Sequence, residues 1–209
     1  MVVPAKVADE ALLAGRRQQI VSTATGVMLE KGFHRTSIRD IAAAADITMG
    51  TLYLYISRKE DVLYLIASAI MEDLSDGLLA VEPRETPLDT LHAAAEHFFN
   101  AVAGLRREVA LLYRESASML PEHLEVLKQS ELRERDFLAE IIRQGMEQGQ
   151  FRPVNPELVA HNIIVLAHMW ALKGWALKDD FDVPSYFNAQ FELILADVLP
   201  KRREKSGVS

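Results

Sequence analysis

Four hydroxyl side chains surround a glycine between residues 48 and 55. They are Thr48, Thr51, Tyr53 and Tyr55, and Gly50 lies among them. Hydroxyls donate hydrogen bonds to phosphate oxygens and base edges, and threonine methyls and tyrosine rings pack on thymine methyls. A glycine inside a helix costs about 1 kcal/mol relative to alanine. Gly50 therefore favours a backbone that closely approaches another surface, and this stretch is a candidate for contacting DNA.

Two short helices joined by a tight turn are expected to position these residues. Ser37 and Asp40 have the spacing of a capping box, and Thr48 is a suitable N-cap for a helix over 49–55. Small residues at 42–45 permit a close crossing of the two helices. Apolar residues are expected to bury the contact: Ile38, Ile41, Ile47 and Leu52. The result is a helix-turn-helix pattern, with Tyr53 and Tyr55 exposed on a helix that can enter the major groove.

Helical periodicity extends along nearly the whole chain, and no segment is a credible strand. We expect a first helix that ends at Gly32, and further helices at 59–79, 87–103, 106–119, 121–148, 156–178 and 183–199. Pro121, Pro156 and Pro184 fall at helix starts, where a missing N–H is tolerated. The predicted fold is all-α. Its predicted parts are a three-helix DNA-binding domain (1–60), a larger ligand-binding and dimerisation domain (61–200) and a disordered basic tail (201–209).

The charge distribution agrees with this division. The net charge is +2 in residues 1–60, −9 in the remainder, and −7 over all 209 residues. A basic head on an acidic body is typical of a module that binds a polyanion. An acidic body is also an ordinary means of keeping a protein soluble, so charge alone does not decide the matter.

Composition excludes several classes of protein. The chain has no cysteine, so disulfides, thiolate metal sites and cysteine nucleophiles are excluded. The longest aliphatic run, 163–167, is far shorter than the roughly 20 residues of a membrane span. Residues 2–5 lack the basic start and apolar core of a signal peptide. We expect a cytoplasmic protein with no membrane partner.

Motifs for catalysis are lacking in the sequence. It contains no glycine-rich phosphate loop, nucleophile elbow or paired-histidine metal motif. His161 and His168 share a helix face but lie about 10.5 Å apart along the axis, too far for one metal ion. His92 and Glu96 have i, i+4 spacing, which is usual for a surface pair. We expect neither an enzyme nor a bound metal or cofactor.

Four blocks of the sequence resemble the TetR-type (TetR/AcrR) transcriptional regulators, in the family's order and spacing. The blocks are Gly32-Phe33, Thr36-Ser37-Ile38-Arg39-Asp40-Ile41-Ala42, Gly50-Thr51-Leu52-Tyr53-Leu54-Tyr55 and Lys59-Glu60-Asp61-Val62-Leu63. The resemblance covers about residues 16–66. Ile56 departs from it, because these proteins usually have Phe there.

The resemblance implies a homodimeric repressor that binds operator DNA and is released by a small effector. It implies that an N-terminal head binds DNA, and that a larger C-terminal domain binds the effector and dimerises through its last two helices. Carried onto this chain, phosphate contacts fall on Thr36, Tyr53, Tyr55 and Lys59. Positions near base edges fall on Arg39, Thr48, Gly50 and Thr51.

Apolar, aromatic and methionine side chains in the body fit the lining of a lipophilic pocket between helices, and they fit a core equally well. The candidates are Phe98, Phe99, Val102, Leu112, Tyr113, Met119, Ile142, His168, Met169, Trp170 and Trp175. Arg106, Arg107 and Arg114 can bind the phosphates of a coenzyme A thioester, or pair with nearby glutamates.

We favour an acyl effector, free or as its acyl-CoA. One alternative is a planar aromatic or cationic drug, which Tyr113, Trp170 and Trp175 would suit by stacking. An alternative from another class is a helical interaction module that does not bind DNA at all.

The last two predicted helices are the expected dimer interface. The helix over 156–178 is apolar around most of its circumference, which implies burial on several sides. Together with the helix over 183–199 it can form four helices across a twofold axis. The residues expected there are Ile163, Ala167, Phe187, Phe191, Ile194, Leu195 and Val198.

Overall fold

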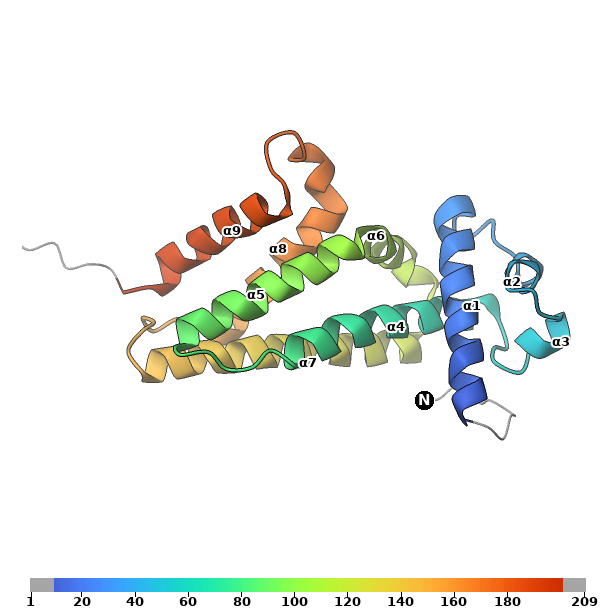
Figure 1. Ribbon diagram of the computed structural model, residues 1–209, viewed down its shortest axis with the longest axis horizontal. Coiled ribbons are helices and arrows are strands. Elements are labelled where there is room, and N and C mark those ends of the chain that lie inside the picture. Colours follow the sequence, from blue (N-terminus) through green and yellow to red (C-terminus); the bar gives the residue numbers. More distant parts are fainter. Residues whose placement is uncertain (1–9, 201–209) are drawn as a thin grey trace, which may run out of the picture. The chain divides into compact units, whose positions relative to one another are not determined.

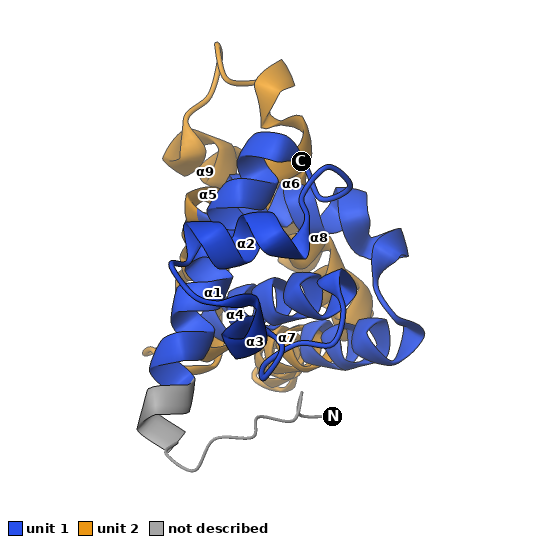
Figure 2. Ribbon diagram, turned by 90° about the vertical axis from the view of Figure 1, so that its right-hand side faces the viewer, with its two compact units in different colours: residues 1–74, 105–131 blue, residues 75–104, 132–209 orange. Residues whose placement is uncertain are grey.

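The computed structural model describes residues 10–200, and all regular structure in that range is helical (Figure 1). The predicted all-α class is therefore confirmed. The described chain forms two compact units (Figure 2). The first unit comprises the residues up to 74 together with 105–131, and the second comprises 75–104 together with the residues from 132 onward. The predicted tail over 201–209 lies outside the described residues, and the predicted domain boundary at residue 60 stays a prediction.

The first unit holds the N-terminal helices and a later pair. These are α1 (Glu10–Lys31), α2 (Ile38–Ala44), α3 (Met49–Leu52), the start of α4 (Lys59–Leu79), α6 (Arg106–Glu115) with a 3-10 turn (Ser116–Ser118), and the start of α7 (Pro121–Glu147). Helix α1 packs on α2 and α6, and α2 packs on α3. Gly32 ends α1 with a φ of 82°, a conformation that glycine adopts without strain.

The predicted capping signals of α2 and α3 are confirmed. The Ser37 hydroxyl accepts a hydrogen bond from the Asp40 N–H at 3.1 Å, and the Asp40 carboxylate accepts one from the Ser37 N–H at 2.8 Å. Thr48 caps α3 by accepting a hydrogen bond from the Thr51 N–H at 3.0 Å. Between the helices, Asp46 adopts a φ of 51°, in the left-handed region that aspartate tolerates better than most residues.

Helix α3 is shorter than predicted, because it ends at Leu52 rather than at residue 55. The N–H groups of Leu54 and Tyr55 donate to the carbonyls of Thr51 and Leu52, three residues back, and this tightens the chain out of the α-helix. Of the four residues predicted to bury the contact between α2 and α3, Ile41 and Leu52 are fully buried. The other two are half-buried: Ile38 and Ile47.

The second unit is built on α5 (Pro87–Gly104), α8 (Pro156–Lys173) and α9 (Val183–Val198). Helix α5 packs on both α8 and α9, and α8 packs on α9. The predicted helices over 106–119 and 156–178 end earlier, at Glu115 and Lys173, because each changes there to a 3-10 turn. Within residues 10–200, no helix is long and apolar enough to span a lipid bilayer.

Aromatic side chains join α5 to α9 in the second unit. Phe99 of α5 lies with its ring centroid 5.2 Å from that of Phe187, and Phe187 lies 5.4 Å from Phe191. His92 of α5 contacts both phenylalanines of α9 edge-on, each at 5.1 Å. Such pairs contribute about 0.5–1.5 kcal/mol each beyond the burial of their area. These phenylalanines therefore belong to the core of the unit.

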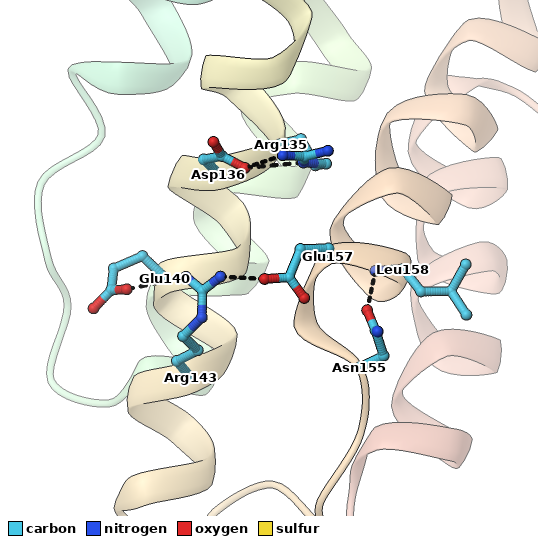
Figure 3. A network of polar contacts seen from close by, with 7 residues as sticks. All are labelled: Arg135, Asp136, Glu140, Arg143, Asn155, Glu157 and Leu158. Carbon is cyan, nitrogen blue, oxygen red and sulfur yellow. Dashed lines mark hydrogen bonds and ion pairs between the residues drawn. The ribbon is translucent and has the colours of Figure 1, made fainter.

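Polar contacts fasten the start of α8 to α7 (Figure 3). Arg143 of α7 donates to Glu157 in the first turn of α8, and it also pairs with Glu140 at 3.2 Å. Asn155 caps α8 by accepting a hydrogen bond from the Leu158 N–H at 2.7 Å. Exposed ion pairs are worth about 0–1 kcal/mol. This network therefore sets the direction in which α8 starts more than it stabilises the fold.

Phe151 lies directly over a point of α7 that has no side chain, at Gly145. A Cβ added to Gly145 would lie 2.2 Å from Cδ2 of the Phe151 ring, and that ring is buried. We expect Gly145→Ala to lower the free energy of unfolding by about 1–3 kcal/mol, because the ring must move out of its place. Chemical denaturation at fixed chain concentration measures the change.

Gly26→Ala is the matched control for that substitution. Gly26 also lies inside a helix, and nothing within 4 Å would meet an added Cβ there. The control is expected to be neutral or stabilising by up to about 1 kcal/mol. A Gly145→Ala variant as stable as Gly26→Ala would contradict the prediction.

His168 of α8 makes the stability of the fold depend on pH. It is buried, with its ring centroid 5.8 Å from that of Phe98, and burial lowers its pKa to about 4 from its ordinary value near 6.5. Between these pH values the unfolded chain binds a proton that the folded chain does not. The contribution of His168 to the free energy of unfolding is therefore fully present above pH 6.5. It is lost as the pH falls toward 4, by about 3 kcal/mol in total.

The pH dependence can be assigned to His168 by comparing the wild-type chain with His168→Leu. The difference between their free energies of unfolding should change over pH 6.5 to 4 and stay constant above pH 7. Two curves that remain parallel throughout would show that His168 does not carry the effect.

Candidate nucleic-acid interface

The N-terminus of α3 presents two threonine hydroxyls. Thr48 is exposed, and its Oγ1 lies 2.9 Å from Oγ1 of the half-buried Thr51. One of the two hydroxyls donates its proton to the other, so the second hydroxyl can donate its own proton to an acceptor outside the chain. The pair can therefore donate to a base edge or a phosphate without breaking the cap of α3.

Gly50 is exposed on the same short helix, one residue before Thr51. A Cβ added there would have Thr48 Oγ1 as its nearest neighbour at 3.7 Å, which is an ordinary contact. Its φ also lies outside the range that disfavours other residues. Among the described residues, neither steric contact nor backbone conformation requires a glycine at this position.

The two tyrosines that follow differ in exposure. Tyr53 is 51% exposed, whereas Tyr55 is only 7% exposed. The expectation that Tyr55 is exposed is wrong, because the chain turns after Leu52 and directs that ring into the interior. Tyr53 remains a well-placed donor, and the phosphate contact predicted for Tyr55 stays a prediction.

Lys59 joins the start of α4 to the segment that follows α1. Its ammonium donates to the carbonyls of Phe33 and His34 at 2.9 and 3.3 Å, and lies 4.3 Å from the centroid of the Phe33 ring. A lysine ammonium has three N–H donors, so these carbonyls leave one for another acceptor. The ammonium is thus held at a fixed position, with capacity for a phosphate.

Thr36 directly precedes the capping box of α2, and Arg39 lies within it, between Ser37 and Asp40. Thr36 is buried, and its hydroxyl donates to the Gly32 carbonyl at 2.9 Å, so that proton is already used within the chain. Arg39 is exposed. Beside it, hydrogen bonds from the Ser37 hydroxyl and the Lys31 ammonium hold the pKa of Asp40 well below its ordinary value. Asp40 therefore keeps its negative charge, and Lys31 at 2.9 Å balances it.

One residue that supports this surface was missed by sequence reasoning. The side-chain amide of Gln19 in α1 donates to the carbonyl of Ala45 at 2.7 Å. This bond ties α1 to the turn between α2 and α3. The two residues are 26 positions apart, and no local spacing marks such a pair.

The predicted ligand-binding residues divide into three groups by exposure. Six of them are buried: Phe98, Phe99, Val102, Met119, Ile142 and His168. Three are half-buried, namely Leu112, Met169 and Trp170, and two are exposed, namely Tyr113 and Trp175. Leu112, Tyr113 and Met119 belong to the first unit and the others to the second. Trp175 is 70% exposed, which contradicts its expected place in an apolar lining. Phe99 packs on Phe187 within the core of the second unit.

The predicted interface residues on α8 and α9 differ in burial, and their role in a dimer stays a prediction. Five of them are buried within this chain: Ile163, Ala167, Phe187, Phe191 and Val198. Ile194 and Leu195 are half-buried. One face of the α8–α9 pair is left open, and Ile194 and Val198 lie along it.

That open face carries a groove of about 350 Å³, here called the α8–α9 groove. It is lined by Val159, Asn162, Val165, Leu166, Gln190, Leu193, Ile194, Asp197 and Val198. Leu193, which lines this groove, is 68% exposed. At one end, Arg152 donates to the carboxylate and the carbonyl of Asp197. An apolar groove with an exposed leucine is typical of a protein–protein contact.

The described part of the chain contains no group of three or more acidic or histidine residues that could hold a metal ion. His92 lies 3.9 Å from Glu96, as expected of a surface pair, and its ring packs against α9.

Two family models match the chain. One, described as bacterial regulatory proteins of the tetR family, matches residues 20–64, and the other, a tetracyclin repressor-like C-terminal domain, matches residues 84–172. The HTH-type transcriptional regulator HbdR of Aromatoleum sp. (strain CIB) is 30% identical over 198 residues, which cover 94% of this chain and 86% of that protein. The chain belongs to the TetR family. The resemblance found in its sequence is thereby confirmed.

Solved structures show the TetR fold over most of the chain. A tetR-family regulator from Rhodococcus RHA1 superimposes with a TM-score of 0.79 at 23% identity, over 89% of this chain and 98% of that one. AibR, solved in complex with isovaleryl coenzyme A and operator DNA, gives a TM-score of 0.70 at 26% identity, over 89% and 100% of the two chains. The fatty acid metabolism regulator protein of Bacillus subtilis (strain 168) is 23% identical, over 86% and 94%. This TetR-family chain is a transcriptional regulator.

Proposed function

We propose that this regulator is a repressor that binds operator DNA as a homodimer and is released by a small apolar effector, with an acyl-CoA favoured. In this proposal residues 1–60 form the DNA-binding domain and 61–200 the effector-binding and dimerisation domain. The observation that carries it is the N-terminus of α3, where Thr48 and Gly50 are exposed and no contact with the described residues requires the glycine.

The DNA contacts divide by chemistry. Thr48, Thr51 and the backbone at Gly50 approach base edges, where hydroxyls and a close backbone read sequence, and Arg39 lies beside them. Tyr53 and Lys59 bind phosphates, whereas the buried side chains of Thr36 and Tyr55 support the head from within. Phosphate contacts fix the register of a protein on the duplex but carry no sequence information.

The α8–α9 groove supports the dimer. Its exposed Leu193 and half-buried Ile194 can pack against the same groove of a second copy across a twofold axis, as in other four-helix interfaces. A twofold dimer carries two symmetry-related copies of α3, which match the two half-sites of a twofold-symmetric operator.

Two observations support an acyl-CoA as the effector. AibR, which shares this fold, was solved with isovaleryl coenzyme A. Arg106 and Arg107 are exposed at the start of α6, where they can bind phosphates. Arg114 instead pairs with Glu115 at 3.0 Å. This agrees with the alternative interpretation of the arginine cluster, in which its members pair with nearby glutamates.

The proposal is tested by selecting binding sites from a random DNA library with the full-length chain. We expect twofold-symmetric sites, bound less tightly as salt rises. Acyl-CoAs, free fatty acids and planar aromatic cations are then titrated into the complex, and fluorescence anisotropy follows the release of DNA. We expect acyl-CoAs to release the operator. A chain that selects no DNA even at low salt would be an interaction module, and release by aromatic cations alone would indicate a drug sensor.

The phosphate role of the arginines is tested in the same titration. Replacing both Arg106 and Arg107 by alanine should weaken acyl-CoA binding about tenfold, because charge-assisted contacts to phosphate are lost. Free fatty acids lack those phosphates, so their binding should not change. Arg84→Ala, at an exposed position outside α6, is the control. Equal losses for acyl-CoAs and fatty acids would contradict the role.

A further inference from the structure

The turn at Phe33 and His34, here called the 33–34 turn, has contacts on two sides. On one side its carbonyls accept the hydrogen bonds of the Lys59 ammonium, and the Phe33 ring lies beneath that ammonium. The His34 ring packs edge-on to Phe33 at 5.3 Å. On the other side, Nε2 of His34 lies 3.3 Å from Oε2 of Glu115. The 33–34 turn thus stands between α6 and the start of α4.

Glu115 is an unusual residue at this position. It is the last residue of α6 and is only 6% exposed. A buried carboxylate is costly unless it is paired, and the C-terminal end of a helix disfavours a negative charge further. Its two oxygens are held by His34 and by Nε of Arg114, the latter at 3.0 Å. The Glu115 carboxylate therefore relies on the 33–34 turn for one of its two partners. The same contact joins the turn to α6.

We propose that Glu115 is a positioning residue for DNA binding. Through His34 it holds the 33–34 turn, and the two carbonyls of that turn aim the Lys59 ammonium at a phosphate. The inference rests on the phosphate role proposed above for Lys59. Hydrogen bonds weaken steeply when donor and acceptor move out of line, so a displaced turn leaves the lysine without its two anchors. A free lysine side chain then loses more rotamer freedom on binding phosphate than a preset one.

The salt dependence of operator binding separates this role from a merely structural one. Each phosphate contact contributes about 0.9 to the slope of log K against log salt, so two copies of Lys59 in a dimer contribute about 2. A variant that only unfolds part of the protein lowers the active fraction and leaves that slope unchanged. A variant that misplaces Lys59 lowers both the affinity and the slope.

The experiment measures operator affinity across a salt series for Glu115→Leu, His34→Ala, Lys59→Met and the double variants with Lys59→Met. His34 is exposed, so its substitution leaves the fold intact even where Glu115→Leu disturbs it. Glu108→Leu, in the first turn of the same helix, is the matched control and should bind as the wild-type chain does. Thermal melts confirm that each variant is folded.

We expect Glu115→Leu and His34→Ala each to weaken binding about 5- to 20-fold and to reduce the salt slope in the direction of Lys59→Met. Added to Lys59→Met, each should cost less than about threefold more, because its effect passes through that lysine. Fully additive losses, or an unchanged slope in both single variants, overturn the inference while Lys59 keeps its role. An unchanged affinity and slope in Lys59→Met overturn the inference together with the role proposed for Lys59.

Discussion

Replacing Leu193 by glutamate is expected to convert the proposed dimer into monomers and to weaken operator binding by about 100-fold or more. Leu193 is 68% exposed and lines the α8–α9 groove, so its own chain does not need it for folding. In the dimer the carboxylate would be buried without a partner, which costs several kcal/mol. Monomers bind one half-site at a time and lose the avidity of two linked heads, which is worth about 10²- to 10⁴-fold.

Light scattering coupled to gel filtration reports the mass, and fluorescence anisotropy reports the affinity. Leu79→Glu is the control, because Leu79 is also an exposed leucine but lies at the end of α4, away from the groove. The control should remain dimeric and bind the operator. A Leu193→Glu chain that is still dimeric at micromolar concentration would place the interface elsewhere.

The choice of Leu193 shows what the sequence could and could not predict about the interface. The helix over 156–178 reads as apolar on most sides, so its sequence does not say which side meets α5 and which stays open. The packing of α5 decides that, since it covers Ile163 and Ala167 together with Phe187 and Phe191. A charge at Phe191 would therefore break the core of the chain before it could test a dimer.

Local signals in the head were read correctly because their causes are local. The capping box of Ser37 and Asp40 and the N-cap at Thr48 act over three residues, and the structure contains both. The contacts that hold the head together extend much further along the chain. Lys59 reaches Phe33 and Gln19 reaches Ala45, each across 26 positions, and no spacing in the sequence marks such pairs.

The predicted ligand residues stay predictions, for a different reason. A pocket lining and a core are both rich in aromatic and methionine side chains, so residue composition cannot distinguish one from the other. Phe99 packs into the α5–α9 core, whereas Trp175 is exposed to solvent. Only the packing of neighbouring helices distinguishes these environments.

Gly50→Ala is expected to leave the fold intact and to weaken operator binding by about tenfold or more. An added methyl at this position meets nothing closer than Thr48 Oγ1 at 3.7 Å, so the chain accommodates it. Alanine also favours a helix by up to about 1 kcal/mol over glycine, so the unfolding free energy should rise or stay unchanged. A loss of affinity without a loss of stability can then come only from outside the chain, where the methyl would keep the backbone of α3 away from DNA.

Gly26→Ala provides the comparison, since it makes the same chemical change inside α1 with open space around it. It should match or exceed Gly50→Ala in stability and bind the operator as the wild-type chain does. Denaturation and anisotropy on the same preparations give both quantities. An unaltered operator affinity in Gly50→Ala would show that the backbone of α3 does not approach DNA closely. The recognition would then have to come from the exposed side chains alone, with the Thr48–Thr51 hydroxyl pair as the first to test.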